Sequence, residues 1–469
     1  MSNAPDPSLP VIIQGGMGAA VSTWRLAKAV AERGQLGVVS GTAIERIIAA
    51  RLLEGDQGGH LRRVLAHFPV PAVAQRVLAA WFRPEGLPAP GAYAPIPMFN
   101  TNSSVGLLEL TVCAAYAEIA LAKEGHSGPV GINLLEKIQL PTLPLIYGAM
   151  LAGVDWVLMG AGIPKDAPGH IAALAKHQPA ILRLNLADGG HEAVPFDPGF
   201  LGATLPPLRK PRFLAVISTD ILAVALSRSG GVDGFVVEGP TAGGHNAPPR
   251  GGTMDAMGQP VYGPRDKADL NRIKGLGLPF WLAGGYCSKA DVEAAQALGA
   301  QGVQVGTPFA FCRESGLAED LRLRTLAAVR TGGLAVFTDP RLSPTGFPFK
   351  SVPLAGTATA LPADSRERRP CVLGYLRQAY RTPEGAVGFR CPAEPEATWA
   401  ARGGDPAVTA GRRCLCHGLM ASAGHPNASP AGLELPIITA GDMLNDLPQR
   451  LPAAKGEYSA GDVLAALGV

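Results

Sequence analysis

FVVEGPTAGGH, from Phe235 to His245, is the stretch that decides the predicted fold. Its first residues are apolar and β-branched, which is typical of a buried strand, and its last residues form a polar, glycine-rich turn. Small residues at a strand end let a ligand approach the backbone, and a histidine moves protons readily near neutral pH. The stretch therefore predicts a buried strand that opens into a site at its C-terminal end.

Two more apolar strands of the same kind follow along the chain. PFWLAGGY contains Gly284 and Gly285, and GVQVGTPFA contains Gly306 and Thr307. Backbone N–H groups at strand-to-helix turns bind anions, and in parallel barrels the loops after strands 7 and 8 commonly hold a phosphate. Two glycine turns in consecutive units favour one shared phosphate site over a role in tight turns alone.

Short apolar strands alternate with amphipathic helices over the first 330 residues. Eight strands are expected, near residues 11–16, 36–41, 129–135, 155–162, 212–219, 235–238, 279–285 and 302–308. Residues 180–211 also contain strand character but no following helix, so we interpret them as an inserted hairpin. Eight β-α units predict an α/β TIM (β/α)8 barrel, and a doubly wound open sheet is the alternative.

Two segments extend this predicted barrel. Residues 42–128, after the second strand, are too long for a simple crossover and form an insertion with helical segments. Residues 331–469 are rich in Pro, Gly and charge, and we expect a loop-rich C-terminal extension or small subdomain there. The expected domains are therefore a (β/α)8 barrel over residues 1–330, with its insertion at about 42–128, and the extension over residues 331–469.

Composition excludes several classes of function. A net charge of +3 over 469 residues, without a dense Lys/Arg run, predicts neither nucleic acid nor anionic membrane as a partner. The apolar stretch from Leu107 to Ala122 contains Glu109 and Glu118, which argues against a membrane span. The N-terminal MSNAPDPSLP does not have the features of a signal peptide, so a cytoplasmic location is expected.

Three further positions are candidate ligand contacts. QGGMG at the first strand end would let a flat ring lie on the backbone, with Met17 as a soft apolar contact. Asn133 is a polar residue in an apolar strand, where it either satisfies the core or binds the polar edge of a heterocycle. His245, after two glycines at a strand end, is a candidate catalytic base or ligand contact.

Four cysteines gather in the predicted extension: Cys371, Cys391, Cys414 and Cys416. Four thiols could bind an Fe–S cluster or Zn²⁺, and His417 adds a nitrogen ligand. Their spacing contains no CxxC pair, so four unlinked reduced thiols are the alternative.

Taken together, IIQGGMG, GINLLE, VVEGPTAGGH, LAGGY and VQVGTPF occur in the order and at about the spacing found in the nitronate monooxygenase (2-nitropropane dioxygenase) family. The chain resembles this family over about residues 11–314. The family consists of FMN-dependent TIM barrels and is similar to flavin enoyl-acyl-carrier-protein reductases. The long form also resembles flavin enoyl reductase subunits of polyunsaturated fatty acid and polyketide synthases.

The resemblance implies a role for each matched residue. His245 would be the base that removes an α-proton from a nitroalkane or nitronate-type substrate. The residues that would line the flavin ring, or lie beside it, are Gln14, Gly16, Met17, Asn133, Ser218, Gly243 and Gly244. The residues that would bind the FMN phosphate are Gly284, Gly285, Gly306 and Thr307.

The resemblance therefore implies an FMN-dependent oxidoreductase that oxidises nitroalkane or nitronate-type substrates with O₂. One alternative is an NAD(P)H-dependent flavin oxidoreductase or enoyl-acyl-carrier-protein reductase, and another is a non-catalytic flavin-binding partner subunit. NAPPRGG after His245 and the long insertions indicate a rebuilt substrate pocket. The expected partners are a small-molecule substrate and either a second copy of the chain, as a homodimer, or a synthase complex.

Overall fold

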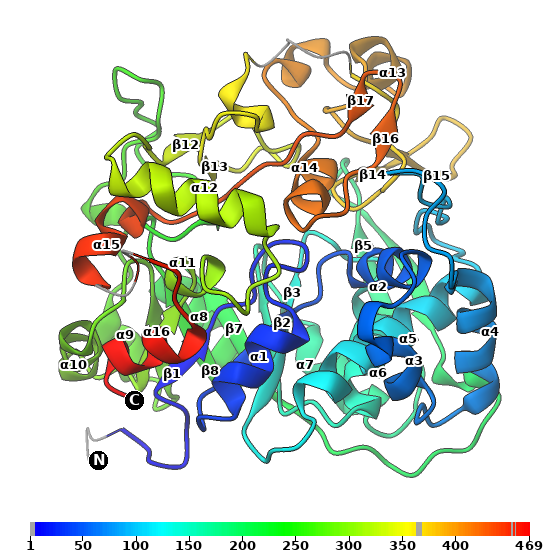
Figure 1. The fold of residues 1–469 in the computed structure, drawn as a ribbon, viewed down its shortest axis with the longest axis horizontal. Coiled ribbons are helices and arrows are strands. Elements are labelled where there is room, and N and C mark those ends of the chain that lie inside the picture. Colours follow the sequence, from blue (N-terminus) through cyan, green and yellow to red (C-terminus); the bar gives the residue numbers. More distant parts are fainter. Residues whose placement is uncertain (1–4, 363–367, 452–453, 455) are drawn as a thin grey trace.

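The computed structural model describes residues 5–362, 368–451, 454 and 456–469. Eight parallel strands form one sheet in the order β1-β11-β10-β8-β7-β4-β3-β2. The first and last strands of that order also meet, because the backbone N of Gln14 donates to the carbonyl of Leu36 at 2.9 Å and the N of Leu36 donates to Ile12 at 3.0 Å. The sheet is therefore closed, which confirms the TIM barrel, and the open-sheet alternative is wrong (Figure 1).

The eight predicted barrel strands are all present. Their bounds are β1 (Ile12–Gln14), β2 (Gly37–Ser40), β3 (Val130–Leu135), β4 (Trp156–Gly160), β7 (Arg212–Ile217), β8 (Gly234–Glu238), β10 (Phe280–Ala283) and β11 (Gly302–Val305). The helices that follow or flank these strands are α1 (Trp24–Ala31), α6 (Thr142–Leu151), α7 (Ala167–Leu174), α8 (Asp220–Ser229), α9 (Leu270–Lys274), α10 (Lys289–Ala297), α11 (Thr307–Ala310) and α12 (Glu319–Arg330).

The inside of the barrel is a packed apolar core. Side chains alternate along each strand, so Val236 of β8 faces inward while its neighbours Phe235 and Val237 face the outer helices. Trp156 and Trp281 meet edge-to-face inside, with ring centroids 6.2 Å apart. This packing closes one end of the barrel, and the C-terminal strand ends form the open mouth.

The insertion after β2 forms a layer of helices on one side of the barrel (Figure 1). It contains α2 (Ile44–Leu53), α3 (His60–Leu65), α4 (Pro71–Trp81) and α5 (Val105–Ala122). Among the described residues, α5 is the one helix long and apolar enough to cross a membrane, but most of it is buried inside the fold. Its two carboxylates are paired there, Glu109 with Arg76 and Glu118 with Arg51.

The predicted hairpin is present as β5 (Ala180–Asn185) and β6 (His191–Phe196), which pair antiparallel outside the barrel sheet. Its tip reaches the C-terminal extension, because the N of Ala187 donates to the carbonyl of Ala379 at 2.9 Å. Leu184, Leu186 and Ala379 form a small apolar cluster at this contact. The hairpin therefore supports the extension from the barrel side.

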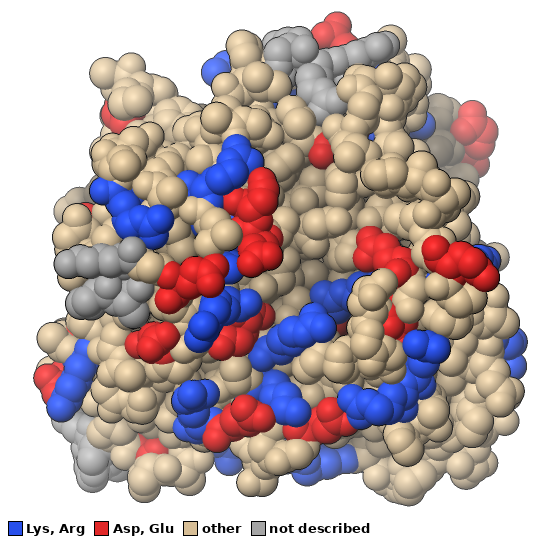
Figure 2. Space-filling view, in the orientation of Figure 1, with Lys and Arg blue, Asp and Glu red and all other residues tan. Residues whose placement is uncertain are grey.

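The chain after α12 crosses the barrel mouth and then returns to the outside of the barrel. Its strands are β12 (Phe337–Asp339), β13 (Phe349–Ser351), β14 (Gln378–Arg381), β15 (Val387–Arg390), β16 (Ala428–Ser429) and β17 (Gly432–Leu433), and its helices are α13 (Glu396–Ala401), α14 (Leu415–Ser422), α15 (Leu447–Arg450) and α16 (Ala460–Leu467). In Figure 1 most of these elements lie above the barrel, whereas α16 lies beside α1 and α10. Figure 2 shows Lys and Arg interspersed with Asp and Glu on this face.

Candidate active site

A cavity of about 500 Å³ lies at the mouth of the barrel. The C-terminal ends of all eight barrel strands contribute to its lining, and the extension covers it. Its volume is in the range of small-molecule and cofactor sites. The predicted site residues that line this cavity are Gly16, Met17, Asn133, Ser218, Gly243, Gly244, His245, Gly284, Gly285, Gly306 and Thr307.

Three polar side chains form the floor of the cavity. Asn133, Glu238 and Gln304 alternate with outward-facing residues on β3, β8 and β11, which directs them into the barrel mouth. The Oε1 atom of Gln304 is buried and has no hydrogen-bond partner among the described residues. Burial raises the pKa of Glu238 to about 7, although the nearby charge of Lys137 opposes that shift. An unpaired amide oxygen in such a floor is suited to a ligand with N–H groups.

Gln14 differs from its predicted role as a flavin contact. Its side chain is fully buried in the barrel wall, where Oε1 accepts from the N of Val38 at 3.0 Å and Nε2 donates to Ser22 Oγ at 2.8 Å. Ser22 in turn donates to the carbonyl of Gly15 and accepts from the N of Met17. Gln14 therefore shapes the turn that presents Met17, and it does not line the cavity.

The glycine turn after β10 presents its backbone at the cavity. Gly284 and Gly285 have positive φ angles of 111° and 91°, which side chains rarely tolerate. The helix that follows begins with a capping box, in which Ser288 and Asp291 bond each other's backbone N–H groups. A β-carbon on Gly284 would lie only 2.7 Å from the Oγ1 of Thr241, so this turn packs directly against the loop after β8.

His245 is held by residues of the C-terminal extension. It lies in the short strand β9 (Gly244–His245), which pairs antiparallel with β13. Its Nε2 is 2.7 Å from Ser343 Oγ, and its ring meets Phe349 edge-to-face at 4.9 Å. Burial, and then the charge of Lys137, hold the pKa of His245 well below 6.5. The imidazole is therefore neutral near pH 7, the form that can accept a proton.

The segment Ile438–Gly441 fixes the rest of the loop after β8. The N of Gly244 donates to Thr439 Oγ1 at 2.9 Å, and the N of Gly441 donates to Thr307 Oγ1 at 2.8 Å. A β-carbon on Gly243 would lie 2.7 Å from the carbonyl carbon of Ala440. The extension thus contacts both the histidine loop and the turn after β11.

Sequence reasoning missed several residues that line the cavity. Lys137 follows β3 by two positions, and Phe347 and Tyr375 come from the extension. A charged residue just past a barrel strand is a signal that could have found Lys137, because such positions face the mouth. The residues from the extension have no comparable signal, since their contact with the mouth depends on long-range packing.

The four cysteines do not form the expected metal site. The described residues contain no group of three or more His, Cys, Asp or Glu side chains placed to hold a metal ion. Burial raises the pKa of the Cys371 and Cys391 thiols, and a hydrogen bond with Cys416 raises that of Cys414. In the described part of the chain these thiols are therefore protonated, free cysteines.

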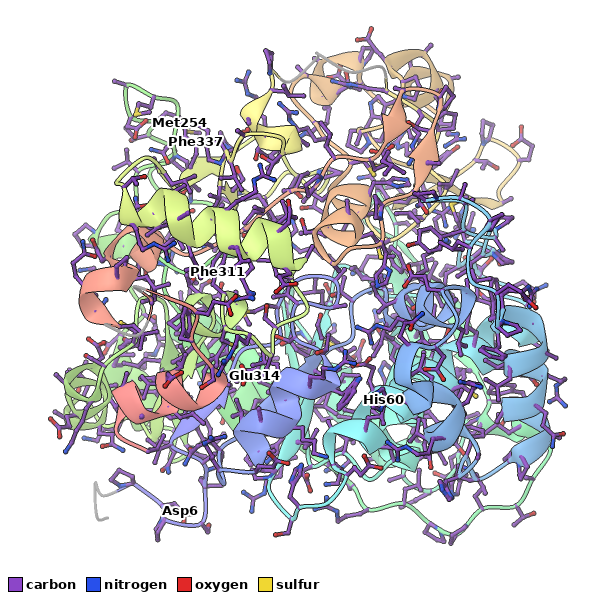
Figure 3. All side chains as sticks on the ribbon, in the orientation of Figure 1. Asp6, His60, Met254, Phe311, Glu314 and Phe337 are labelled. Carbon is purple, nitrogen blue, oxygen red and sulfur yellow. The ribbon has the colours of Figure 1, made fainter. Side chains whose placement is uncertain are left out.

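Figure 3 labels residues at contacts between the barrel and the segments that follow it. Phe311 is fully buried below α12 and also lines the cavity. Glu314 lies nearer α16, where its Oε2 accepts from the N of Ala460 at 2.8 Å. Met254 lies in the projecting loop that follows His245, and Phe337 is the first residue of β12 (Figure 3). That loop is tied to β12 by Gln259, whose Oε1 accepts from the N of Thr338 at 2.9 Å.

The molecule is thus a parallel (β/α)8 barrel with a cofactor-sized cavity at the carboxyl ends of its strands. Residues 211–332 match the model of the nitronate monooxygenase family. This confirms the resemblance for the second half of the barrel, which contains both glycine turns and His245.

Curated relatives agree with this match. A nitronate monooxygenase of Paraburkholderia phytofirmans is 34% identical over 197 residues, which are 40% of this chain and 48% of the relative. A nitronate monooxygenase of Pseudomonas aeruginosa is 33% identical over 117 residues, 24% of this chain and 32% of the relative. The chain spans about half the length, or less, of the curated relatives it matches.

Two solved structures resemble the whole chain at low identity. FabK from Thermotoga maritima has a TM-score of 0.48 at 16% identity, covering 98% of this chain and 91% of that one. Nitroalkane oxidase from Streptomyces ansochromogenes has a TM-score of 0.46 at 16% identity, covering 98% and 94%. Both TM-scores are below 0.5, so the barrel assignment depends on the closed strand order and not on these likenesses.

Proposed function

We propose that this chain is an FMN-dependent oxidoreductase of the nitronate monooxygenase kind, which oxidises nitroalkane or nitronate-type substrates with His245 as the base. The observation that carries the proposal is a neutral, enclosed imidazole beside a cofactor-sized cavity whose rim is made of glycine turns. The family match over residues 211–332 supports the same reaction class.

The residues at the mouth fit a flavin mononucleotide. The turns at Gly284, Gly285 and Gly306 would bind the phosphate through backbone N–H groups, and the amides of Asn133 and Gln304 would bind the polar edge of the ring. The unpaired Oε1 of Gln304 would gain a donor from such a ring. Bound FMN would accept electrons from the substrate and pass them to O₂.

His245 is placed to take the α-proton of the substrate. When Nε2 carries the ring proton, it donates to Ser343 Oγ and leaves the lone pair of Nδ1 for the substrate. Among the described residues, Nδ1 has no hydrogen-bond partner that would compete for this lone pair. His245 is half-buried at the mouth, and burial holds its pKa well below 6.5, which favours the neutral imidazole.

Reduction of an enoyl thioester by NAD(P)H is the second candidate, favoured by the space next to the mouth. A second cavity of about 650 Å³ shares its lining with the first at Lys137, Ile138, Phe347, Tyr375 and Leu376. A small nitroalkane does not need this volume, whereas a long acyl chain would occupy it.

The test uses the purified full-length chain and its visible spectrum. We expect a flavin spectrum that bleaches on anaerobic addition of nitroethane, and His245→Ala should abolish that bleaching while keeping the flavin. His191→Ala, at an exposed histidine of the hairpin, is the matched control. Bleaching by NADPH or NADH but not by nitroethane would replace the first candidate with the second, and a chain without flavin would refute both.

A further inference from the structure

Lys137 has a buried ammonium group that makes no hydrogen bond with any described residue. Its Nζ has no accessible surface and no hydrogen-bond partner among the described residues, and it lies 3.8 Å from the centroid of the Phe347 ring. An ammonium group that is buried without an acceptor has a large desolvation cost. A cation–π contact offsets only a part of that cost.

The acidic groups near Lys137 do not pair with it. Its electrostatic neighbours are Glu136, Glu238 and His245, but among the described residues its Nζ has no hydrogen-bond partner. Glu136 is used elsewhere, since its Oε1 accepts from Gln139 at 3.2 Å and from Asn185 at 3.4 Å. Glu238 lies on the cavity floor, where burial favours its neutral form. An acceptor from outside the chain would complete the environment of Lys137.

Lys137 also lies where the two cavities share their lining. It lines both the mouth cavity and the second cavity, together with Phe347 and Tyr375 of the extension. His245 lines the mouth cavity within electrostatic range of the ammonium group. An oxygen atom bound to Lys137 would therefore hold the adjacent carbon near the imidazole.

We propose that Lys137 binds the oxygen of the group that acidifies the reacting carbon of the substrate, either a nitro group or a thioester carbonyl. With a nitro group, the C–H bond next to it breaks, the proton goes to His245, and the electron pair moves onto the oxygen that Lys137 holds. With an enoyl thioester, a hydride that NAD(P)H supplies would add to the β-carbon, the electron pair of the double bond would move onto the carbonyl oxygen at Lys137, and the α-carbon would then take up a proton. The negative charge on that oxygen also offsets the repulsion between Lys137 and a protonated His245, so the imidazole becomes more basic as the proton moves. This inference rests on the proposed function, since it assigns the substrate group that the same site binds.

Nitrate is the probe, because it presents planar, negatively charged oxygens like those of a nitronate. We expect nitrate to perturb the flavin spectrum of the wild-type chain, with Lys137→Met weakening nitrate binding by about tenfold or more. Lys165→Met removes an exposed lysine near the mouth and is the matched control for net charge. Lys137→Arg, which keeps a cation, should retain part of the affinity.

The pH dependence and the stability provide two further readouts. Burial lowers the pKa of Lys137 to about 8, so nitrate affinity should fall as the pH rises through that value and stay level in Lys137→Met. Removing an unpaired buried charge should leave the unfolding temperature unchanged or raise it, whereas loss of a structural ion pair would lower it.

The outcomes separate this inference from the proposed function. Unchanged nitrate binding by a flavin-containing Lys137→Met chain overturns the role of Lys137 alone. If the wild-type chain contains no flavin, the proposed function fails, and calorimetric titration with nitrate still tests Lys137. If nitrate binding depends on Lys137, two activity assays of Lys137→Met identify the substrate group. Loss of nitroethane turnover would indicate a nitro group, and loss of crotonyl thioester turnover would indicate a thioester carbonyl.

Discussion

The turn after β10 and the loop after β8 border the same cavity, yet different parts of the chain hold them. The β10 turn is organised by the capping box of Ser288 and Asp291, which follow it directly, and Arg450 adds remote hydrogen bonds to the carbonyl of Gly285 and to the carboxylate of Asp291. The β8 loop is held by Ser343 and by Thr439, which are 98 and 195 positions away from the residues they bond.

The two regions also have different proposed roles: the β10 turn would bind the cofactor, and the β8 loop positions the proposed base His245. A phosphate turn needs only glycines and a helix start, and both are local in sequence. The imidazole of His245 depends on a strand and two hydroxyl groups that the extension brings to the barrel mouth. We therefore expect substitutions at the β10 turn to affect the cofactor, and substitutions in the extension to affect chemistry with the cofactor still bound.

The largest expected effect is that of Gly285→Asp. It places a carboxylate where we propose a phosphate, in a backbone conformation with a φ of 91° that side chains rarely adopt. The introduced carboxylate and the FMN phosphate would repel each other strongly at this short distance in an enclosed site. Flavin content should therefore fall to roughly a tenth or less. Flavin released from the purified protein by denaturation, measured per chain, gives the result.

Gly277→Asp is the control for backbone strain. Gly277 has a φ of 71° and open space around its α-carbon, and it does not line the cavity. The Gly277→Asp variant should therefore keep its flavin. Equal loss of flavin in both variants would show that strain, and not the position of a phosphate, explains the result.

The barrel could be predicted from the sequence because its signals are local. Short apolar runs, several of which end in glycine, located all eight strands, and the missing helix after residue 187 identified the β5–β6 hairpin. His245 was found at a strand end for the same reason. Local signals were sufficient wherever a residue's role depends on its own strand and turn.

The rest of the site depends on distant contacts or on the direction of a side chain. Gln14 was placed on the flavin, yet its amide points into the barrel wall and bonds Ser22 and Val38. Ser22, directly before the N-cap residue Thr23 of α1, uses its hydroxyl in that same network. The partner of His245 could not be predicted, because no pattern in the sequence relates Ser343 to a loop 98 residues earlier.

Ser343→Ala should have the next largest effect. It tests the β8 loop, which distant residues of the extension hold. The variant removes the partner of His245 Nε2, so the ring loses its fixed orientation and turnover should fall by about tenfold. Flavin content should not change, because Ser343 makes no contact with the β10 turn. Ser343→Thr, which keeps the hydroxyl, should restore most of the activity.

The pH profile distinguishes loss of orientation from a general disturbance. Because the pKa of His245 is held below 6.5, wild-type turnover should stay level as the pH falls through 6.5 and decline only at lower pH. Ser343→Ala should lower the plateau without moving the decline far, since burial and not Ser343 sets the shift. A decline that begins above pH 6.5 in the wild type would contradict the enclosed, neutral histidine.

Gly243→Ala should act through the contact between the β8 loop and the extension. A β-carbon there would lie 2.7 Å from the carbonyl carbon of Ala440 and 2.8 Å from the N of Gly441, so backbone must move. Overpacking of this kind typically costs about 1–3 kcal/mol. Chemical denaturation should show that loss, and Gly244→Ala, which meets open space, should show only the smaller cost of its φ of 82°.

Ser288→Ala should have the smallest effect, although it removes the capping box at the start of α10, next to the proposed phosphate turn. Loss of the cap costs about 1 kcal/mol, and the Asp291 carboxylate still accepts from the N of Cys287 at 2.8 Å. Flavin should therefore bind only slightly more weakly, as measured by titration of the apoprotein. If Ser288→Ala released flavin as fully as Gly285→Asp, the β10 turn would depend on its helix start and not on its own glycines.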